Sequence, residues 1–289
     1  MTLPPSQTND SSVAQLADQL VGWLRDRNSV AVAFSGGVDS TVVAKAAALA
    51  LGEKSVAVTA VSPSLAQSEL ETARQEAKSI GIRHVEISTD EFLNPSYRAN
   101  AGDRCFFCKD TLYSLTAKQL DGLGVRCMVN GSNTDDLGDY RPGMQAARDH
   151  SVLSPLVEIG CNKASVRQLA RHWQLSVAEK AASPCLSSRV AYGVEVTEER
   201  VQRVERAEAF LRQILGAVEL RVRVEHSELA RIEVAEDAIE RLVKTSTRRA
   251  ITAELLRLGF RRVTIDLNGF RSGSMNDSLQ FVTLGINAK

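Results

Sequence analysis

The chain has 289 residues, which is enough for two domains and a sizeable core. Basic and acidic residues number 35 each, and the resulting formal net charge of +0 argues against a general nucleic-acid binder. Hydrophobic residues make up 44% and charged residues 24%, as in an ordinary soluble globular protein.

The N-terminal segment is not expected to be a signal peptide. Residues 1–12 are polar and lack both a basic region and an apolar stretch. No apolar run approaches the length of a membrane span. We therefore expect a flexible tail over 1–12, no membrane partner and a cytoplasmic location. Five cysteines in such a chain favour reduced thiols over disulfides.

Strands and helices alternate along the next part of the chain. This alternation predicts an α/β fold, a parallel sheet with helices on both faces, over residues 13–192. Ligands of such sheets bind beyond the carboxyl ends of the strands. The expected helices cover 13–25, 41–51, 68–80 (ended by Gly81), 103–120 and 163–173 (capped by Asn162), and the expected strands cover 30–34, 55–61, 84–87 and 127–130.

The pattern changes near Gly193. A long amphipathic helix is expected over 197–215, and two segments then alternate apolar and charged residues, as half-exposed strands do. We therefore predict a smaller C-terminal α+β domain over 193–289. Its further elements are strands over 220–225, 230–234 and 263–267 and helices over 236–244 and 248–258.

The run Ser35-Gly36-Gly37-Val38-Asp39-Ser40 lies between an expected strand and an expected helix. Adjacent glycines allow a tight turn, and a helix N-terminus offers unpaired N–H groups to an anion. The Ser35 and Ser40 hydroxyls add donors. A carboxylate such as Asp39 beside phosphates requires a bridging cation, for which Mg²⁺ is suited. The residues thus predict a site for a nucleotide polyphosphate with Mg²⁺.

This run is not a Walker A loop, because no G-x-x-x-x-G-K-[ST] occurs, and the sequence predicts no lysine reaching into the loop. It resembles the PP-loop, SGGxDS, of ATP pyrophosphatases. That resemblance implies ATP as cosubstrate, with the β,γ-phosphates as leaving group and AMP transferred to an acceptor oxygen. Segment 130–136 is expected at the same edge of the sheet.

Three cysteines form a second group of candidate residues. Cys105 and Cys108 make a C-x-x-C pair, and Cys185 follows Pro184 far along the chain. Such a pair can bind metal, cycle redox or be accidental. Zinc would want a fourth ligand, whereas three thiolates suit a [4Fe–4S] cluster with one iron open. Cys127 is expected to pack in a strand, and no role is assigned to Cys161.

Arginines form a third group. Arg221 and Arg223 alternate on an expected strand, so both guanidiniums share one face and could grip a phosphate. By composition alone, a solvated strand face is the better interpretation. Arg189 could bind a phosphate or lower the pKa of the Cys185 thiol, or be a loop arginine in water.

Several long motifs occur in a fixed order and together resemble the LarE family. They are SGGVDS, RCFFCK, GSNTDDLGDYRPG (131–143), SPCLSSR, RVRVEH followed by ARIEV, and FRSGSMN (270–276). The family comprises ATP-dependent sulfur transferases in the biosynthesis of the nickel-pincer nucleotide. The matches span nearly the whole chain.

The resemblance implies a specific chemistry. ATP would adenylate a carboxylate of a pyridinium-3,5-dicarboxylate mononucleotide, and sulfur would displace AMP to give a thiocarboxylate. In one branch the cysteine matching Cys185 supplies its own sulfur. In another, cysteines matching Cys105, Cys108 and Cys185 hold a [4Fe–4S] cluster, and this chain has all three. Family members form homo-oligomers, and a sulfide donor would be a further partner.

Three other readings compete. A PP-loop tRNA thiolase would need a basic RNA surface, which the zero net charge disfavours. An ammonia-using amidotransferase-type ligase leaves the cysteines unused. The last reading is an ATP-binding protein without enzymatic activity, with a structural zinc site. Arg189, Arg221 and Arg223 are the expected substrate-phosphate residues in the LarE reading.

Overall fold

A computed structural model describes residues 5–138, 142–216 and 218–271 and divides the chain into two compact units. The first unit comprises residues 1–91 and 105–183, and the second comprises 92–104 and 184–289. Residues 1–4 of the expected tail, 139–141 of the 131–143 motif and 272–276 of the closing motif lie outside the described residues.

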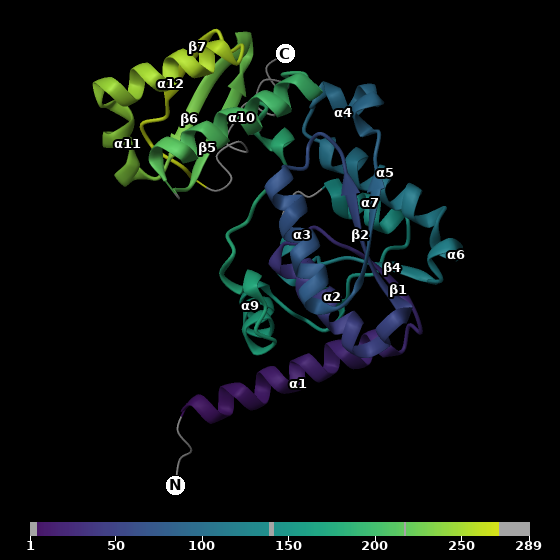
Figure 1. Ribbon diagram of the computed structural model, residues 1–289. Coiled ribbons are helices and arrows are strands. Elements are labelled where there is room, and N and C mark those ends of the chain that lie inside the picture. The colour runs from purple at the N-terminus through teal and green to yellow at the C-terminus, as the bar shows by residue number, and fades with distance from the viewer. Residues whose placement is uncertain (1–4, 139–141, 217, 272–289) are drawn as a thin grey trace, which may run out of the picture. The chain divides into compact units, whose positions relative to one another are not determined.

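The first unit contains a four-stranded, fully parallel sheet in the order β3-β2-β1-β4 (Figure 1). This is the expected α/β architecture. The central strand β1 and its neighbour β2 are rich in valine and alanine, as suits strands covered on both faces, whereas the edge strand β3 is partly exposed. Their bounds are β1 (Val30–Ala33), β2 (Ser55–Val61), β3 (Arg83–Ser88) and β4 (Cys127–Val129).

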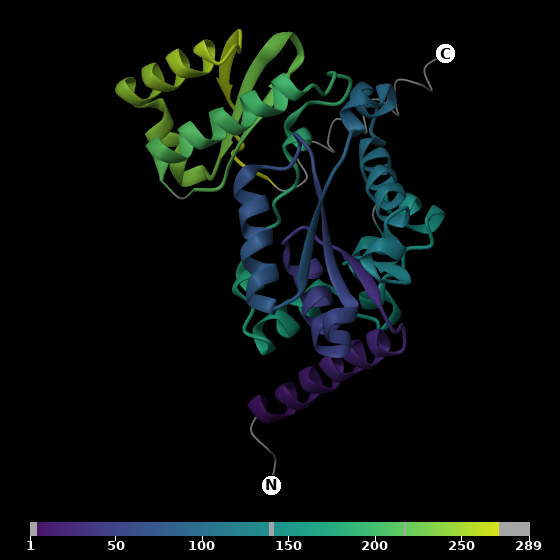
Figure 2. The same ribbon diagram turned by 45° about the vertical axis from the view of Figure 1, so that its right-hand side comes forward.

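Helices cover both faces of this sheet. Val30 and Val32 of β1 pack with apolar residues of α1, α2, α3 and α9, while Ala31 packs with residues of α5 and α7. Figure 2 shows α3 and α5 on opposite sides of the strands. The helices of the first unit are α1 (Pro5–Arg25), α2 (Val38–Leu51), α3 (Gln67–Ile80), α5 (Arg104–Ala117), α6 (Leu120–Leu123), α7 (Pro142–Asp149), α8 (Pro155–Glu158) and α9 (Lys163–His172).

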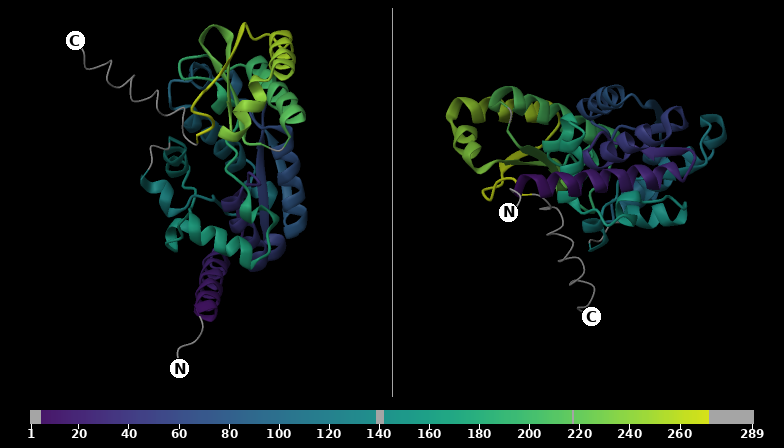
Figure 3. Two further views of the ribbon diagram at one scale, coloured as in Figure 1. Left: turned by 90° about the vertical axis from the view of Figure 1, so that its left-hand side faces the viewer. Right: turned by 90° about the horizontal axis from the view of Figure 1, so that it is seen from below.

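The sequence predicted one helix start correctly and another wrongly. Asn162 caps α9 as expected, since its side-chain oxygen accepts from the Ser165 N–H at 2.9 Å. The first helix, in contrast, begins at Pro5, so residues 5–12, expected in a flexible tail, are helical (Figure 3). The expected helix 103–120 is divided into α5 and α6.

The second unit contains a three-stranded sheet in the order β5-β6-β7, with β5 and β6 antiparallel and β6 and β7 parallel. α10 and α12 contact the sheet and each other, and α11 contacts both of these helices. This is the expected smaller α+β domain. Its elements are α4 (Pro95–Ala99), α10 (Glu198–Leu215), β5 (Leu220–Glu225), β6 (Leu229–Val234), α11 (Glu236–Val243), α12 (Thr245–Arg257) and β7 (Arg262–Ile265).

The expectation of half-exposed strands is wrong for β5, because both of its faces are buried. Leu220, Val222 and Val224 are 0% exposed, and the alternate residues Arg221 and Arg223 are only 9% and 5% exposed. A guanidinium can be buried where protein acceptors replace its water. Alternation of apolar and charged residues therefore marks here a buried polar face rather than a solvated one.

The units also divide elsewhere than the expected boundary at residue 193. Segment 184–192 belongs to the second unit, and so does 92–104, since the two are hydrogen-bonded together. Asn100 donates to the carbonyls of Val190 and Ala191 at 3.2 and 2.8 Å. The Tyr97 and Ser187 hydroxyls are 2.8 Å apart. Cys185 and Arg189 are consequently part of the second unit.

Candidate active site

The turn between β1 and α2 requires glycine at its second position. Gly36 has φ +68°, and a Cβ there would lie 2.9 Å from the Ala73 Cα of α3. Both facts exclude a side chain. Gly37 precedes α2 and has no side chain to cap it, so the first N–H groups of the helix stay available. The SGGVDS run thus forms the expected strand–loop–helix anion cradle.

The two loop serines hold this turn closed. The Ser40 hydroxyl donates to the Gly37 carbonyl at 3.1 Å and accepts from the Ser35 N–H at 3.2 Å. The Ser35 and Ser40 hydroxyl oxygens are 3.2 Å apart. Their hydrogen bonds fix the loop conformation within the protein itself, so the cradle is formed before a ligand arrives.

Asp39 is held by residues from two other segments of the first unit. Its Oδ1 accepts from Asn133 Nδ2 at 3.1 Å, and its Oδ2 forms an ion pair with Lys163 at the start of α9. Segment 130–136 lies at the loop, as expected. Indeed, a Cβ on Gly131 would lie 2.7 Å from the Ser40 nitrogen, so only glycine allows this approach.

Two lysines reach the loop from distant parts of the chain, which corrects the expectation that none would. Lys163 pairs with Asp39, and Lys180 Nζ lies 3.4 Å from the Gly36 carbonyl and 2.7 Å from Glu69 Oε2. Sequence reasoning missed both because neither is near the loop in sequence. One signal existed for Lys163: a cation on the first turn of a helix opposes the helix dipole.

The loop also suits Mg²⁺. Within the described ranges there is no group of three or more His, Cys, Asp or Glu that could hold a metal ion. Mg²⁺ typically binds one or two carboxylates and completes its octahedron with water and substrate phosphates. A single carboxylate, Asp39, beside open helix N–H groups fits that mode. Asp39 would hold Mg²⁺ together with the phosphates of a nucleotide.

The candidate cluster cysteines are divided between the units. Cys105 is exposed and Cys108 half-buried on the first turn of α5, where a spacing of three places both on one face of the helix. Cys185 is exposed directly before the short helix 186–189 of the second unit. Two of the three candidate thiols thus lie on one helix face of the first unit, and the third belongs to the second unit.

The other two cysteines are core residues. Cys161 is 0% exposed and packs in the main core of the first unit, where burial raises the pKa of its thiol to about 11. Cys127 packs against the same core, and burial raises the pKa of its thiol too. Cys127 therefore has the packing role that its strand position predicts, and neither thiol is activated as a nucleophile.

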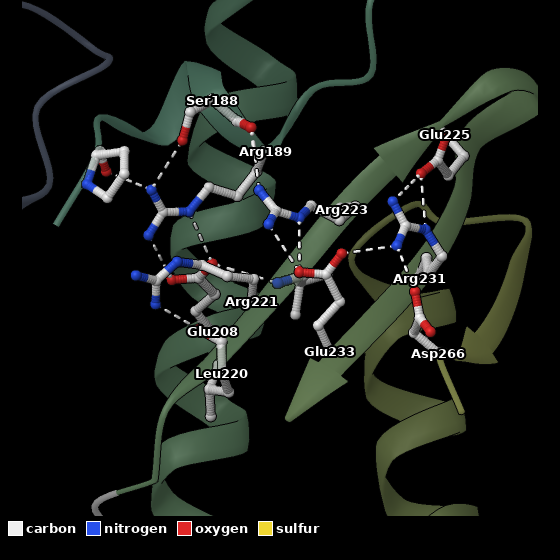
Figure 4. Close-up of polar contacts among 12 residues, drawn as sticks. Ser188, Arg189, Glu208, Leu220, Arg221, Arg223, Glu225, Arg231, Glu233 and Asp266 are labelled. Atoms are coloured by element: carbon white, nitrogen blue, oxygen red, sulfur yellow. Dashed lines mark hydrogen bonds and ion pairs between the residues drawn. The ribbon is translucent and has the colours of Figure 1, made fainter. Parts of the chain in front are cut away.

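Arg189, Arg221 and Arg223 are brought together in the second unit, around Glu208 of α10 and Glu233 of β6 (Figure 4). All three are buried, at 3%, 9% and 5% exposed. The alternative that Arg221 and Arg223 form a solvated strand face is therefore wrong.

Arg189 is fully engaged by the protein. It pairs with Glu208 at 3.0 Å and donates to the carbonyls of Pro184 and Cys185, the latter at 3.0 Å. It also lies 3.1 Å from the Ser188 hydroxyl (Figure 4). With its donors so occupied, Arg189 holds the backbone around Cys185 and has little capacity left for a phosphate.

Arg223 is likewise neutralised, since its Nε and NH2 donate to Glu233 Oε2 at 3.0 and 2.7 Å. Arg221 differs. It donates to the Leu220 carbonyl at 2.7 Å and lies 5.0 Å from the Phe270 ring, but within the described part of the chain no ion pair to it occurs. Burial lowers the pKa of Arg221, the charges of Arg189 and Arg223 lower it further, and the nearby Glu208 carboxylate opposes them. Arg221 thus keeps donors for an anion.

Comparison with known proteins relates this geometry to a family. Residues 13–137 match the family model for asparagine synthase. The pyridinium-3,5-bisthiocarboxylic acid mononucleotide synthase of Lactiplantibacillus plantarum is 38% identical over 90% of this chain and 93% of its own length. The chain belongs to the LarE family. Its PP-loop domain is the first unit, and its fold is the PP-loop type with a smaller C-terminal sheet domain.

Two other LarE-like relatives have no described activity. Uncharacterized protein slr1717 of Synechocystis sp. is 46% identical over 85% of this chain and 91% of its own length. Uncharacterized protein MJ0830 of Methanocaldococcus jannaschii is 26% identical over 84% and 91%. Family membership identifies the Ser35–Ser40 turn as a PP-loop. Among the described residues, no helix is long and apolar enough to cross a membrane.

Proposed function

We propose that this LarE-family protein is an ATP-dependent sulfurtransferase acting on pyridinium-3,5-dicarboxylate mononucleotide. The carboxylate oxygen attacks the α-phosphorus of ATP, pyrophosphate leaves, and the carboxylate becomes an acyl adenylate. Sulfur then attacks the carbonyl carbon and AMP leaves, which yields the thiocarboxylate. The observation that carries this proposal is the formed PP-loop in a chain 38% identical to a pyridinium-3,5-bisthiocarboxylic acid mononucleotide synthase.

The PP-loop residues serve the first step. A carboxylate is inert toward sulfur until its oxygen becomes part of a leaving group, which is what adenylation achieves. The N–H groups at the start of α2, which have no side-chain cap, would stabilise the departing pyrophosphate, and the hydroxyls of Ser35 and Ser40 would add donors once they turn from each other and from the Gly37 carbonyl. Asp39 would hold Mg²⁺ against the phosphates, which spreads the developing negative charge.

Arg221 is the residue best suited to the substrate phosphate, because it is buried, carries no carboxylate partner among the described residues and lies on a strand backed by packed helices. Arg223 would add charge from the next position on the same face while staying paired with Glu233. Arg189 is reassigned to the loop that carries Cys185.

Cys185 is the proposed sulfur residue, and the chain offers two ways to supply the sulfur. In one, its thiol attacks the acyl adenylate, and elimination across the Cα–Cβ bond then breaks the Cβ–Sγ bond and leaves dehydroalanine at position 185. In the other, Cys105, Cys108 and Cys185 would hold a [4Fe–4S] cluster, and such a cluster would supply sulfide as the nucleophile. We favour the cluster, because Cys105 and Cys108 share an accessible helix face and have no other chemical role here.

The test is to incubate anaerobically purified protein with ATP, Mg²⁺ and the mononucleotide. AMP and pyrophosphate are expected, whereas ADP and phosphate would contradict the PP-loop assignment. Iron and acid-labile sulfide are measured in the same preparation, and zinc instead would favour the structural-metal alternative.

Variants separate the two sulfur sources. Cys185→Ala should abolish transfer and leave adenylation. With a cluster, Cys105→Ala or Cys108→Ala should lose iron and all transfer, and the wild-type chain mass should stay constant through turnover. Loss of one H₂S from the wild-type chain would instead show that Cys185 is consumed. Size-exclusion chromatography of the same preparation tests the expected homo-oligomer.

A further inference from the structure

Asp39 is the loop residue that Mg²⁺ requires, yet both of its carboxylate oxygens already have partners within the first unit. Oδ1 accepts from Asn133 at 3.1 Å, and Oδ2 is paired with the Lys163 ammonium. Asn133 is a neutral donor that can remain beside a metal-bound carboxylate. Lys163 is a cation on the very oxygen that Mg²⁺ would take, so the two compete for it.

The position of Lys163 is electrostatically unfavourable within its own helix. It is the first residue of α9, where the unpaired N–H groups carry partial positive charge. The α9 start is fixed by the Asn162 cap and by Asp135, whose carboxylate accepts from the Lys163 N–H at 3.1 Å. A cation in this position is favoured by nearby anions, and Asp39 is the carboxylate that pairs with the Lys163 ammonium, whereas Asp135 accepts from its backbone N–H.

We propose that Lys163 is a phosphate-binding residue of the ATP site, and that Asp39 and the polyphosphate are its two alternative partners. When Mg²⁺ binds Asp39, the ammonium is released and moves to the β- and γ-phosphate oxygens. The side chain is suited to this exchange, since it is 37% exposed and has a flexible four-carbon stem. The inference rests on the ATP site of the proposed function and assigns a residue that the PP-loop motif does not contain.

Lys180 is not expected to bind the phosphates in this way. Its ammonium is bonded to Glu69 at 2.7 Å and to the Gly36 carbonyl at 3.4 Å, so it braces the loop against α3. Neither of those partners would be claimed by Mg²⁺. Among the described residues, Lys163 is the lysine whose ion-pair partner is also the proposed Mg²⁺ ligand, so its pair with Asp39 would break when nucleotide and Mg²⁺ bind together.

The experiment is calorimetric titration of the full chain with Mg²⁺·ATP, Mg²⁺·pyrophosphate and AMP. Lys163→Ala should weaken binding of Mg²⁺·ATP and Mg²⁺·pyrophosphate by about 10- to 100-fold, since charge-assisted bonds to two phosphates are lost. AMP binding should change by less than about twofold. Lys163→Gln serves as a second variant, and far-UV circular dichroism checks folding. Lys78→Ala, an exposed lysine on the last turn of α3, is the matched control.

A double-mutant cycle tests the exchange itself. Asp39→Asn leaves Lys163 without its anion, so ATP binding in the absence of Mg²⁺ should tighten relative to wild type. This increase in ATP affinity should largely vanish in the double variant Asp39→Asn, Lys163→Ala, because the increase comes from the released Lys163 ammonium. Wild-type affinity of both Lys163 variants for Mg²⁺·pyrophosphate would overturn the inference and leave the proposed function standing. Failure of the wild-type chain to bind ATP would instead refute the proposed function.

Discussion

Arg189 and Arg221 are both buried in the second unit, but Arg189 forms an ion pair with a carboxylate and Arg221 forms none among the described residues. Arg189 pairs with Glu208 and with two backbone carbonyls, while Arg221 has one carbonyl and an aromatic ring. Burying a guanidinium with unused donors destabilises the protein unless an anion binds to those donors. The same residue type therefore has a structural role at one position and a binding role at the other.

Replacing Arg221 with Ala should weaken binding of the mononucleotide by about 10- to 100-fold, because a charge-assisted phosphate contact is lost. ATP binding should remain within about twofold. Both affinities can be measured by titration calorimetry. If the variant binds the mononucleotide with wild-type affinity, the role of Arg221 is purely structural.

Replacing Arg189 with Lys should uncouple the two half-reactions. Lysine cannot bond Glu208 and the carbonyls of Pro184 and Cys185 at once, so the Cys185 backbone loses its anchor. AMP should still form, while the yield of thiocarboxylate per AMP falls several-fold. Arg212→Ala is the control, because Arg212 also pairs with Glu208 but is exposed and forms no described contact with that loop. Equal losses of AMP and thiocarboxylate would indicate general damage instead.

At the scale of elements, the β1–α2 turn depends on how closely α3 approaches it. Gly36→Ala would place a Cβ against the Ala73 backbone at 2.9 Å and force a residue with φ +68°. We expect a loss of stability of about 2 kcal/mol or more and loss of ATP binding. Urea unfolding measures the first, with Gly22→Ala as control, since nothing lies within 4 Å of a Cβ there. Unchanged stability would mean that α3 can move away from the turn.

Side chains of β2 and β3 are linked to the residue that follows β1 and precedes the PP-loop. The Thr59 hydroxyl of β2 donates to the Phe34 carbonyl at 2.8 Å and lies 2.8 Å from His84 Nε2 of β3. Burial lowers the pKa of His84, an effect that Glu86 opposes and Arg74 adds to. The folded chain thus holds this imidazole neutral at pH values where the unfolded chain takes up a proton.

The free energy of unfolding should consequently fall as the pH drops below about 6.5, the ordinary pKa of the histidine, and the loss should level off below the lowered folded value. Urea unfolding at pH 7.5 and pH 5.5 tests this. In His84→Gln, which has no titrating ring, the difference between the two pH values should be smaller. An equal difference in both proteins would assign the acid sensitivity to other groups.

At the scale of the whole molecule, the second unit is assembled from two separate stretches of chain. Segment 184–192 lies against the edge of β5, where the Ala191 N–H donates to the Val224 carbonyl at 2.9 Å. It also contributes Arg189 to Glu208, a carboxylate that is 2% exposed. A fragment that starts at residue 193 would leave this carboxylate with the Val222 N–H and the exposed Arg212 and without its buried cation.

A fragment spanning 184–289 should therefore be more stable than one spanning 193–289. Breaking one partner from a buried ion pair typically costs about 3–5 kcal/mol, which is a large part of the stability of a small domain. Urea midpoints followed by circular dichroism compare the two fragments at equal concentration. Equal midpoints would support a domain boundary near residue 193 instead.

Local features of the fold were predictable because their causes are local. An apolar run predicted the strand 55–61 and an apolar–charged alternation predicted the strand 220–225, and these bounds match β2 and β5 to the residue. Asn162 caps its helix through a bond to a residue three positions on. Helix ends were placed less well, as at Pro5, since apolar spacing does not mark where a polar helix begins.

The same contrast holds for the site. The PP-loop, the cysteine pair and the arginine pair are short patterns, and the sequence by itself determined the family and the nucleotide-binding loop. Tertiary structure alone decided that Lys163 meets Asp39, that Arg189 anchors the Cys185 backbone and that Arg221 and Arg223 are buried. Those facts depend on which distant segments pack together and on which charges they neutralise. No pattern within a single segment contains that information.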